Sequence, residues 1–289
     1  MASRYSVSSP TIDPSTTTRV NSTATKPSKN RAIKTGVGWL RLPLIVTYAF
    51  LYIPIAVLVI MSFNASKTPF TWKGFSTQWY GELFNDELIR QGFINTMIVA
   101  VSATIMATIL GTLLAIGIAR YFRSAIVEAY SLAPAIIPDL ALAIGLLAFF
   151  ALVGVTLSLF SVLLSHVVFC MAFVAAVVIA RLGQTDSSLE EASRDLGASA
   201  TTTFFKITLP SLAPGIIAGA LLAFTLSLDE FVIAFFTDGP TTPTLPIVIY
   251  SMVRFGVTPE INALAAILLL VSFTIVLSAQ RITRLTDAV

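Results

Sequence analysis

The stretch LALAIGLLAFFALVGVTLSLFSVLLSHVVFCMAFVAAVVIA, residues 140–180, contains 41 residues without a formal charge. A helix needs about 20 predominantly apolar residues to cross the hydrocarbon core of a bilayer. This run is therefore long enough for two crossings joined by a tight turn. It decides the class of the fold, because a soluble globular domain has no place to bury so long an uncharged segment.

Shorter uncharged runs flank this stretch on both sides, at 42–66, 91–119, 207–228 and 261–280. Together the runs predict an all-α membrane protein with six transmembrane helices, at about 43–63, 93–119, 132–153, 157–180, 212–236 and 261–280. The composition agrees, since 56% of residues are hydrophobic and 11% are charged, against about 25% charged in soluble domains. It excludes a globular cytosolic enzyme, a disordered protein and a disulfide-rich secreted scaffold.

The first 30 residues contain seven Ser and six Thr and little that is apolar, which is typical of a disordered segment. The first apolar run begins near Leu42, too late for a cleavable signal peptide, so we expect a retained membrane anchor. Lys and Arg mark the cytoplasmic side of a membrane protein. If both termini are cytoplasmic, 14 basic residues lie on that side and four on the other. The sequence therefore predicts cytoplasmic N- and C-termini.

The first external loop, 64–92, contains a short helical pattern flanked by the aromatic residues Trp72, Trp79 and Tyr80. Aromatic residues in such a place commonly anchor a protein at the membrane interface. The alternative is that they form a contact surface for an external partner.

The cytoplasmic loop 181–210 is long for a connector, and long loops are usually functional or disordered. Asp186 or Ser187 can cap a short helix whose apolar face comprises Leu189, Ala192 and Leu196. Gly197 supplies a turn residue after this helix. A second short helix is expected to begin at Thr201–Thr203 and to end at Pro210.

The spacing in this loop resembles the "EAA" signature of ABC-importer permeases. The matching positions are Glu191-Ala192-Ser193, Gly197, Ile207 and Leu209-Pro210, with Ser193 in place of the second Ala as the departure. Further stretches are similar to the polyamine branch of that family, at 50–54, 62–67, 164–170, 223–230 and 256–265. The resemblance covers about residues 42–285, and Trp79-Tyr80-Gly81-Glu82-Leu83 is most similar to putrescine-type permeases.

The resemblance implies a type I ABC-importer permease fold and a transport function rather than an enzymatic one. It divides the chain into a disordered cytoplasmic tail (1–37), a first transmembrane helix with its external loop (38–92) and a permease core (93–285). The loop 181–210 would dock on an ABC ATPase subunit that binds ATP, so this chain itself needs no cofactor. The residues implied in ATPase coupling are Leu189, Glu191, Ala192, Asp195, Leu196 and Gly197. The further partners implied are a second permease subunit of different sequence, which would form a heterodimer with this chain, and an external solute-binding protein. The complex would lie in the bacterial inner membrane.

Three acidic residues, Asp139, Asp229 and Glu230, lie within or beside the predicted spans. Charged side chains inside a membrane are costly and usually line a pathway or meet a partner. Carboxylates are the expected ligands of ammonium groups, so we interpret these acids, with Thr225 on the same helical face as Asp229, as a pathway for a polyamine such as putrescine or spermidine. The alternative for Asp229 and Glu230 is simple hydration at a helix end. The alternative for Asp139, which follows Pro138, is stabilisation of a helix N-terminus.

His166 lies in the middle of a predicted span, with Cys170 four residues later. Two ligands do not make a zinc site, so we expect no metal and a neutral His166 that bonds to a neighbouring helix. Other functions stay open at this point: an ABC permease for a different solute, such as ferric iron or sulfate, an autonomous proton-coupled carrier, or an intramembrane enzyme. The acids disfavour an anionic solute, and the sequence shows neither an internal repeat nor a catalytic constellation.

Overall fold

The computed structural model describes residues 41–68, 71–122, 124–256 and 258–286. The predicted tail at 1–37 lies outside these residues. In the described ranges the regular structure is helical, with one isolated bridge between Asn64 and Phe75. The described residues divide into two units between Leu51 and Tyr52, and this division falls within helix α1 (Arg41–Met61). The prediction of an all-α fold is confirmed.

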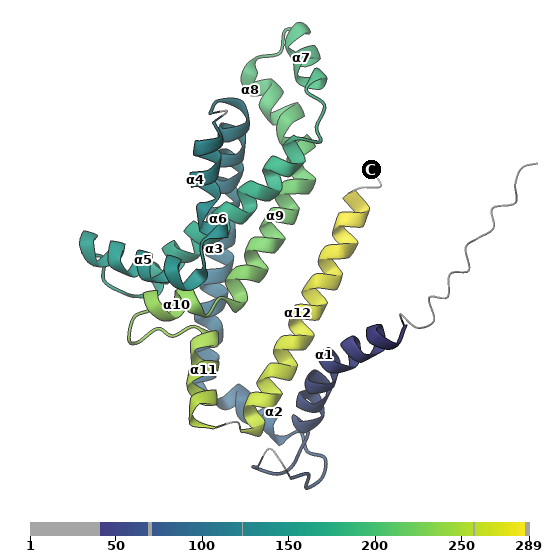
Figure 1. Cartoon of the computed structure of the whole chain (residues 1–289), viewed down its shortest axis with the longest axis vertical. Helices are drawn as coiled ribbons and strands as arrows, with labels where there is room; N and C mark the ends of the chain where they lie inside the picture. Colours follow the sequence, from purple (N-terminus) through teal and green to yellow (C-terminus); the bar gives the residue numbers. More distant parts are fainter. Residues whose placement is uncertain (1–40, 69–70, 123, 257, 287–289) are drawn as a thin grey trace, which may run out of the picture. The chain divides into compact units, whose positions relative to one another are not determined.

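The long apolar helices of the second unit are α3 (Glu87–Arg120), α6 (Leu159–Leu182) and α9 (Leu209–Asp229), and they pack against one another (Figure 1). Small residues allow this close packing. A Cβ added at Gly111 of α3 would lie 2.8 Å from the Met171 carbonyl oxygen and 2.8 Å from Val174 on α6. Ala and Val account for most of the buried side chains that the three helices contribute to the shared core, with Ile116, Phe169, Cys170 and Leu212 among the others.

Two predicted spans are broken rather than continuous. The third, expected at 132–153, is a pair of helices, α4 (Ala125–Ile136) and α5 (Asp139–Val153), bent by 103°. Pro138 causes the break, because it has no backbone N–H and forces the preceding residue into an extended conformation. Asp139 therefore begins a new helix.

The second break follows α9. The prediction of one helix over 212–236 is wrong, since α9 ends at Asp229, Glu230 is extended, and α10 covers Val232–Thr237. The Glu230 Oε1 accepts a hydrogen bond of 2.9 Å from the Ile233 N–H. A side chain that bonds to the backbone in this way competes with helix continuation and starts the next helix instead.

The prediction that the second loop helix ends at Pro210 is also wrong. Helix α8 (Ala200–Thr203) continues through a π-helical turn, η1 (Phe204–Thr208), directly into α9. The Leu209 N–H bonds to the Phe204 carbonyl five residues earlier. Pro210 thus falls in the first turn of α9, where its missing N–H is tolerated.

Two further helices complete the unit, α11 (Leu245–Phe255) and α12 (Pro259–Thr286). Helix α11, which the sequence did not predict, is fixed to α3 at its start. The Leu245 N–H donates to the Thr96 Oγ1 at 2.7 Å, and the Asn95 Nδ2 donates to the Pro243 carbonyl at 3.0 Å. By length and composition, four described helices can cross a membrane, or five if α4 and α5 count as one span. Six spans and cytoplasmic termini stay predictions.

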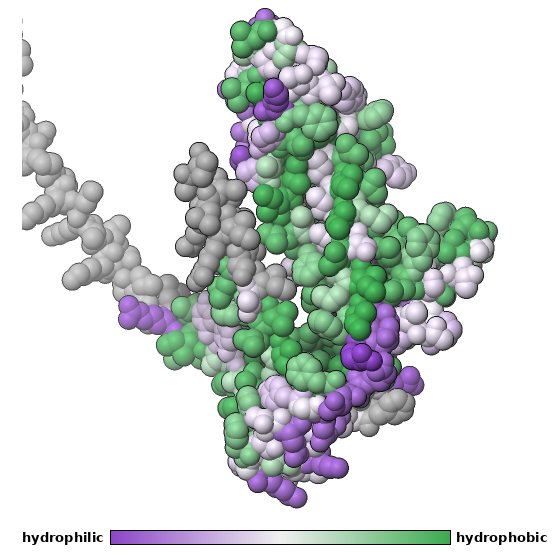
Figure 2. All heavy atoms as spheres, turned by 180° about the vertical axis from the view of Figure 1, so that it is seen from behind, coloured by the Kyte–Doolittle hydropathy of each residue, from purple (hydrophilic) through white to green (hydrophobic). Residues whose placement is uncertain are grey.

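Hydrophilic side chains gather around α7 (Ser188–Asp195) and near α2 (Gln78–Asn85), while hydrophobic ones cover the helices between them (Figure 2).

The short helix α2 lies where the sequence predicted one. Trp79, however, does not lie at a lipid interface: it is 3% exposed and packs with Leu83, Leu245, Val248 and Leu264. Its Nε1–H donates to the Asn64 carbonyl at 2.7 Å. Trp72, in contrast, is 48% exposed.

We expect Trp79→Phe to destabilise the protein because it removes this buried hydrogen bond and leaves the Asn64 carbonyl without its donor. The expected cost is about 1–3 kcal/mol, which lowers the midpoint of thermal unfolding in detergent by several degrees. Trp72→Phe is the matched control, with a change of less than about 0.5 kcal/mol expected for an exposed site. Equal midpoints for the two variants would contradict the assignment of Trp79 to the core.

Candidate functional site

The predicted pathway acids lie at the two helix breaks. Asp139 begins α5, Asp229 is the last residue of α9, and Glu230 lies between α9 and α10. Helices α5 and α10 pack together, and both Asp139 and Asp229 act electrostatically on Glu230. The structure thus brings the three predicted acids into one region, at the kind of broken helix that forms binding sites in transporters.

The two neighbouring acids differ in accessibility. Asp229 is exposed, whereas Glu230 is 8% exposed and bonds to the backbone of α10. The predicted span over 212–236 contains both acids in one helix, but α9 ends between them. Thr225 is exposed one turn before Asp229, and its hydroxyl donates to the Leu221 carbonyl of its own helix at 2.9 Å. Asp229 is therefore more open to a solute than Glu230, and Asp139 at the start of α5 is exposed as well.

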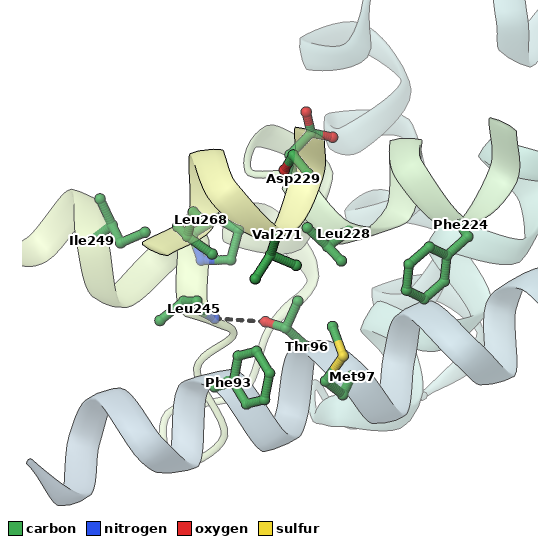
Figure 3. A pocket seen from close by; sticks show the side chains of 12 residues that line it. Phe93, Thr96, Met97, Phe224, Leu228, Asp229, Leu245, Ile249, Leu268 and Val271 are labelled. Carbon is green, nitrogen blue, oxygen red and sulfur yellow. Dashed lines mark hydrogen bonds between the residues drawn. The ribbon is translucent and has the colours of Figure 1, made fainter. Parts of the chain in front are cut away.

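Asp229 also borders a cavity of about 300 Å³ between α3, α9, α11 and α12. The cavity is lined mainly by apolar side chains, among them Phe93, Met97, Phe224 and Leu228. Figure 3 shows Asp229 at the edge of this group, with its carboxylate directed away from Phe93 and Met97. An apolar cavity with a single carboxylate at its rim suits a ligand that combines a hydrocarbon chain with a cation.

His166 bonds to a neighbouring helix, as predicted. Its Nδ1 lies 2.7 Å from the Ser227 Oγ of α9, and both residues are buried. Cys170 is also buried, and its Sγ lies 3.5 Å from the Ala223 carbonyl. These contacts connect α6 to the last two turns of α9, just before the helix break. His166 and Cys170 therefore contribute to helix packing.

The predicted coupling residues lie on α7 and in the turn that follows it. The Asp186 Oδ1 accepts from the Ser188 N–H at 2.9 Å, which lowers the pKa of Asp186, so Asp186 rather than Ser187 provides the hydrogen bond at the start of the helix. Gly197 has φ +84°, as expected for a turn residue. No residue of α7 is buried, and Leu189 and Leu196 are 55% and 89% exposed.

Ser193, the departure from the family signature, has a clear role. Its Oγ lies 3.0 Å from the Thr203 Oγ1, which connects α7 to α8. An alanine at this position could not form the bond.

Glu190 is the residue of this loop that the sequence analysis did not single out. Its Oε1 accepts hydrogen bonds from the Arg120 guanidinium at the end of α3 and from the Thr208 Oγ1 at 2.7 Å. Partial burial would raise the pKa of Glu190, but these hydrogen bonds and the nearby positive charges of Arg120 and Arg194 outweigh it and lower the pKa. No spacing signal identifies Glu190, because its partners are 70 and 18 residues away.

Comparison with known proteins shows the family. The sequence matches the binding-protein-dependent transport system inner membrane component family over residues 107–288. The chain belongs to this family. Membership confirms the predicted resemblance, the location in the inner membrane, and a transport component rather than an enzyme.

Among relatives, the spermidine/putrescine transport system permease protein PotC of Haemophilus influenzae is 44% identical over 241 residues, which cover 83% of this chain and 94% of the relative. The putrescine transport system permease protein PotI of Escherichia coli K12 is 43% identical over 240 residues, 80% of this chain and 85% of the relative.

Solved structures confirm the type of fold. A chain of a bacterial ABC transporter involved in import of the acidic polysaccharide alginate matches with a TM-score of 0.69 at 15% identity, over 89% of this chain and 99% of that one. A chain of the MetNI methionine ABC transporter matches with a TM-score of 0.56 at 20% identity, over 73% and 99%. At these identities the likeness concerns the fold alone.

We expect Gly197→Ala to loosen the end of α7, because φ +84° costs a residue with a Cβ about 1–2 kcal/mol even in the open space around this position. Hydrogen exchange of the amides of residues 192–198 should accelerate. Gly183→Ala is the control in the same loop, since Gly183 has φ −65° and its added Cβ meets only ordinary contacts. Unchanged exchange in both variants would show that the turn does not depend on glycine.

Proposed function

We propose that this chain is the transmembrane permease subunit of an ATP-driven ABC importer that moves polyamines, such as putrescine and spermidine, across the bacterial inner membrane. The observation that carries the proposal is the convergence of Asp139, Asp229 and Glu230 at two broken helices. The 43–44% identity to spermidine/putrescine and putrescine permeases supports the choice of solute.

The chemistry of a polyamine fits this arrangement. The solute is a flexible hydrocarbon chain with a cationic amine at each end, so it needs separated acceptors and an apolar path between them. The exposed carboxylate of Asp229 receives one ammonium group, and the adjoining apolar cavity accommodates methylene groups. The second ammonium is received by Asp139 or by an acid of the partner permease. Glu230, buried and bonded to α10, contributes negative potential rather than a direct contact.

The permease core, 93–285, works with three partners. An ABC ATPase subunit binds ATP and docks on the exposed face of α7, where Leu189, Ala192 and Leu196 provide apolar contacts. Glu191 and Asp195 are exposed beside that face and supply polar contacts at its rim. A second permease subunit completes the pore as a heterodimer, and an external solute-binding protein delivers the polyamine. Closure of the ATPase dimer moves α7, and this movement switches the pathway between opening to the outside and opening to the cytoplasm.

The proposed orientation places loop 181–210 in the cytoplasm, where the ATPase is. In a Cys170→Ala background, a cysteine at Thr77 should react with a membrane-impermeant thiol reagent in intact cells. A cysteine at Ser187 should react only after the cells are opened. Both positions are exposed, so the difference reports the side of the membrane. Reaction at Ser187 alone in intact cells would invert the topology and exclude docking of a cytoplasmic ATPase.

For substrate recognition, we expect Asp229→Asn to reduce the initial uptake of radiolabelled putrescine by about ten- to a hundredfold, because a charge-assisted hydrogen bond is worth about 1.5–3 kcal/mol. Glu230→Gln should have a smaller effect, since glutamine keeps an oxygen that can accept from Ile233. The assay uses cells that lack other polyamine importers, with expression checked by immunoblot.

Glu128→Gln, an exposed acid in the first turn of α4, is the matched control and should transport normally. Unchanged uptake of putrescine and spermidine in the Asp229→Asn, Glu230→Gln double variant would mean that the acids are only hydrated. The cation pathway would then be wrong, whereas membership of the ABC-importer family would stand.

A further inference from the structure

The neighbouring residues Glu190 and Glu191 of α7 differ in exposure and in hydrogen bonding. Glu191 is exposed and its carboxylate makes no hydrogen bond within the described residues, whereas the side chain of Glu190 is 19% exposed. Adjacent residues of a helix point about 100° apart, so the two carboxylates cannot serve the same neighbour. Glu190 faces the membrane helices, and Glu191 is free to face a partner.

The Glu190 carboxylate joins three elements at one point. Arg120 is the last residue of α3, and its guanidinium N–H donates a hydrogen bond to Oε1. Thr208 is the last residue of the π-helical turn before α9, and its hydroxyl donates a second hydrogen bond to the same oxygen. The Arg120 side chain is 28% exposed, so solvent screens this pair less than a fully exposed one. α3 and α9 both line the cavity beside Asp229.

Elsewhere α7 is separated from the ends of the membrane helices. A polar cavity of about 710 Å³, lined by Arg120, Arg181, Glu190, Arg194 and Ser211 among others, lies between α7 and the ends of α3 and α6. α7 packs on α8 and η1, which follow it in sequence, but its ion pair to α3 crosses 70 residues. Within the described residues, the Arg120–Glu190 pair is the side-chain bond that joins α7 to α3.

We infer that Glu190 is a positioning residue that transmits the movement of α7 simultaneously to α3 and α9, the two helices on which the cation pathway is built. This inference rests on the proposed role of α7 as the docking helix for the ATPase. Through Arg120 the carboxylate moves the end of α3, and through Thr208 it moves the start of α9. Glu191 and the apolar face of α7 hold the ATPase, and Glu190 connects that docked helix to the pathway.

The test measures putrescine uptake per ATP hydrolysed in the complete complex reconstituted in liposomes. In Glu190→Gln and in Arg120→Gln, this ratio should fall about fivefold or more, the scale of a typical coupling free energy between sites. The ATPase should still co-purify, because the outward face of α7 is unchanged. The Arg120→Gln, Glu190→Gln double variant should show no lower ratio than the lower single variant, since each change alone already removes the ion pair between these residues.

Glu87→Gln is the matched control. Glu87 forms an ion pair with Arg90 at the other end of α3, where both side chains are exposed, and its loss should leave the ratio unchanged. If Glu190 only stabilises the loop, its variants lower the thermal midpoint and reduce uptake and ATP hydrolysis in proportion, with the ratio constant. That result, or an additive double variant, would overturn the inference.

A separate variant tests docking of the ATPase on α7 independently of the role inferred for Glu190. Leu196→Asp places a charge on the exposed apolar face of α7 and should abolish co-purification of the ATPase. If the ATPase remains bound, docking on this face is wrong, and a constant uptake ratio in Glu190→Gln then overturns the Glu190 inference as well. If Leu196→Asp releases the ATPase while Glu190→Gln keeps a normal ratio, docking is supported and the role of Glu190 is rejected.

Discussion

A backbone amide that leaves its helix inside a bilayer finds no water, so each break in a membrane helix must provide a partner for the groups it frees. The break between α9 and α10 depends on one such bond, from the Ile233 N–H to the Glu230 carboxylate. Glu230, whose carboxylate stabilises this break, also places negative charge close to Asp229 and Asp139. A hydrophobic residue at 230 would remove both the backbone partner and the charge, so the architecture and the chemistry of this region cannot be changed independently.

The second constraint is close packing. Gly111 and other small residues let α3, α6 and α9 pack closely. Densely packed interfaces tend to have discrete arrangements. A displacement at the ends of α3 and α9 is therefore expected to move these helices as whole bodies, which is how contacts at Arg120 and Thr208 would affect the proposed pathway at Asp229.

Much of the fold follows from the sequence because hydropathy is a local property. The uncharged runs locate α3 and α6 within a few residues at most ends, and the turn at Gly197 follows from its residue type. The proline at 138 marks a break near the start of the third span, but the break at Glu230 was missed, because a hydropathy run does not record where a backbone hydrogen bond changes its partner.

The remaining differences come from contacts distant in sequence. Burial of Trp79 requires Leu245, Val248 and Leu264, more than 160 residues later. The role of Glu190 requires Arg120 and Thr208. For the candidate site, residue chemistry led to the choice of Asp139, Asp229 and Glu230, and their role stays a proposal. The different exposures of Asp229 and Glu230 depend on the break after α9, which the predicted continuous span did not anticipate.

The π-helical turn at Phe204–Thr208 has a consequence for the register of the whole α8–α9 rod. A π-type turn accommodates one residue more than an α-helical turn, and one residue corresponds to about 100° of rotation around the axis. An uninterrupted α-helix through this segment would rotate Thr203 by roughly that angle away from Ser193 while the face of α9 that holds Ser227 stayed in place. The extra residue thus acts as a fixed angular offset, which lets a single rod present one face to α7 and a differently directed face to α6.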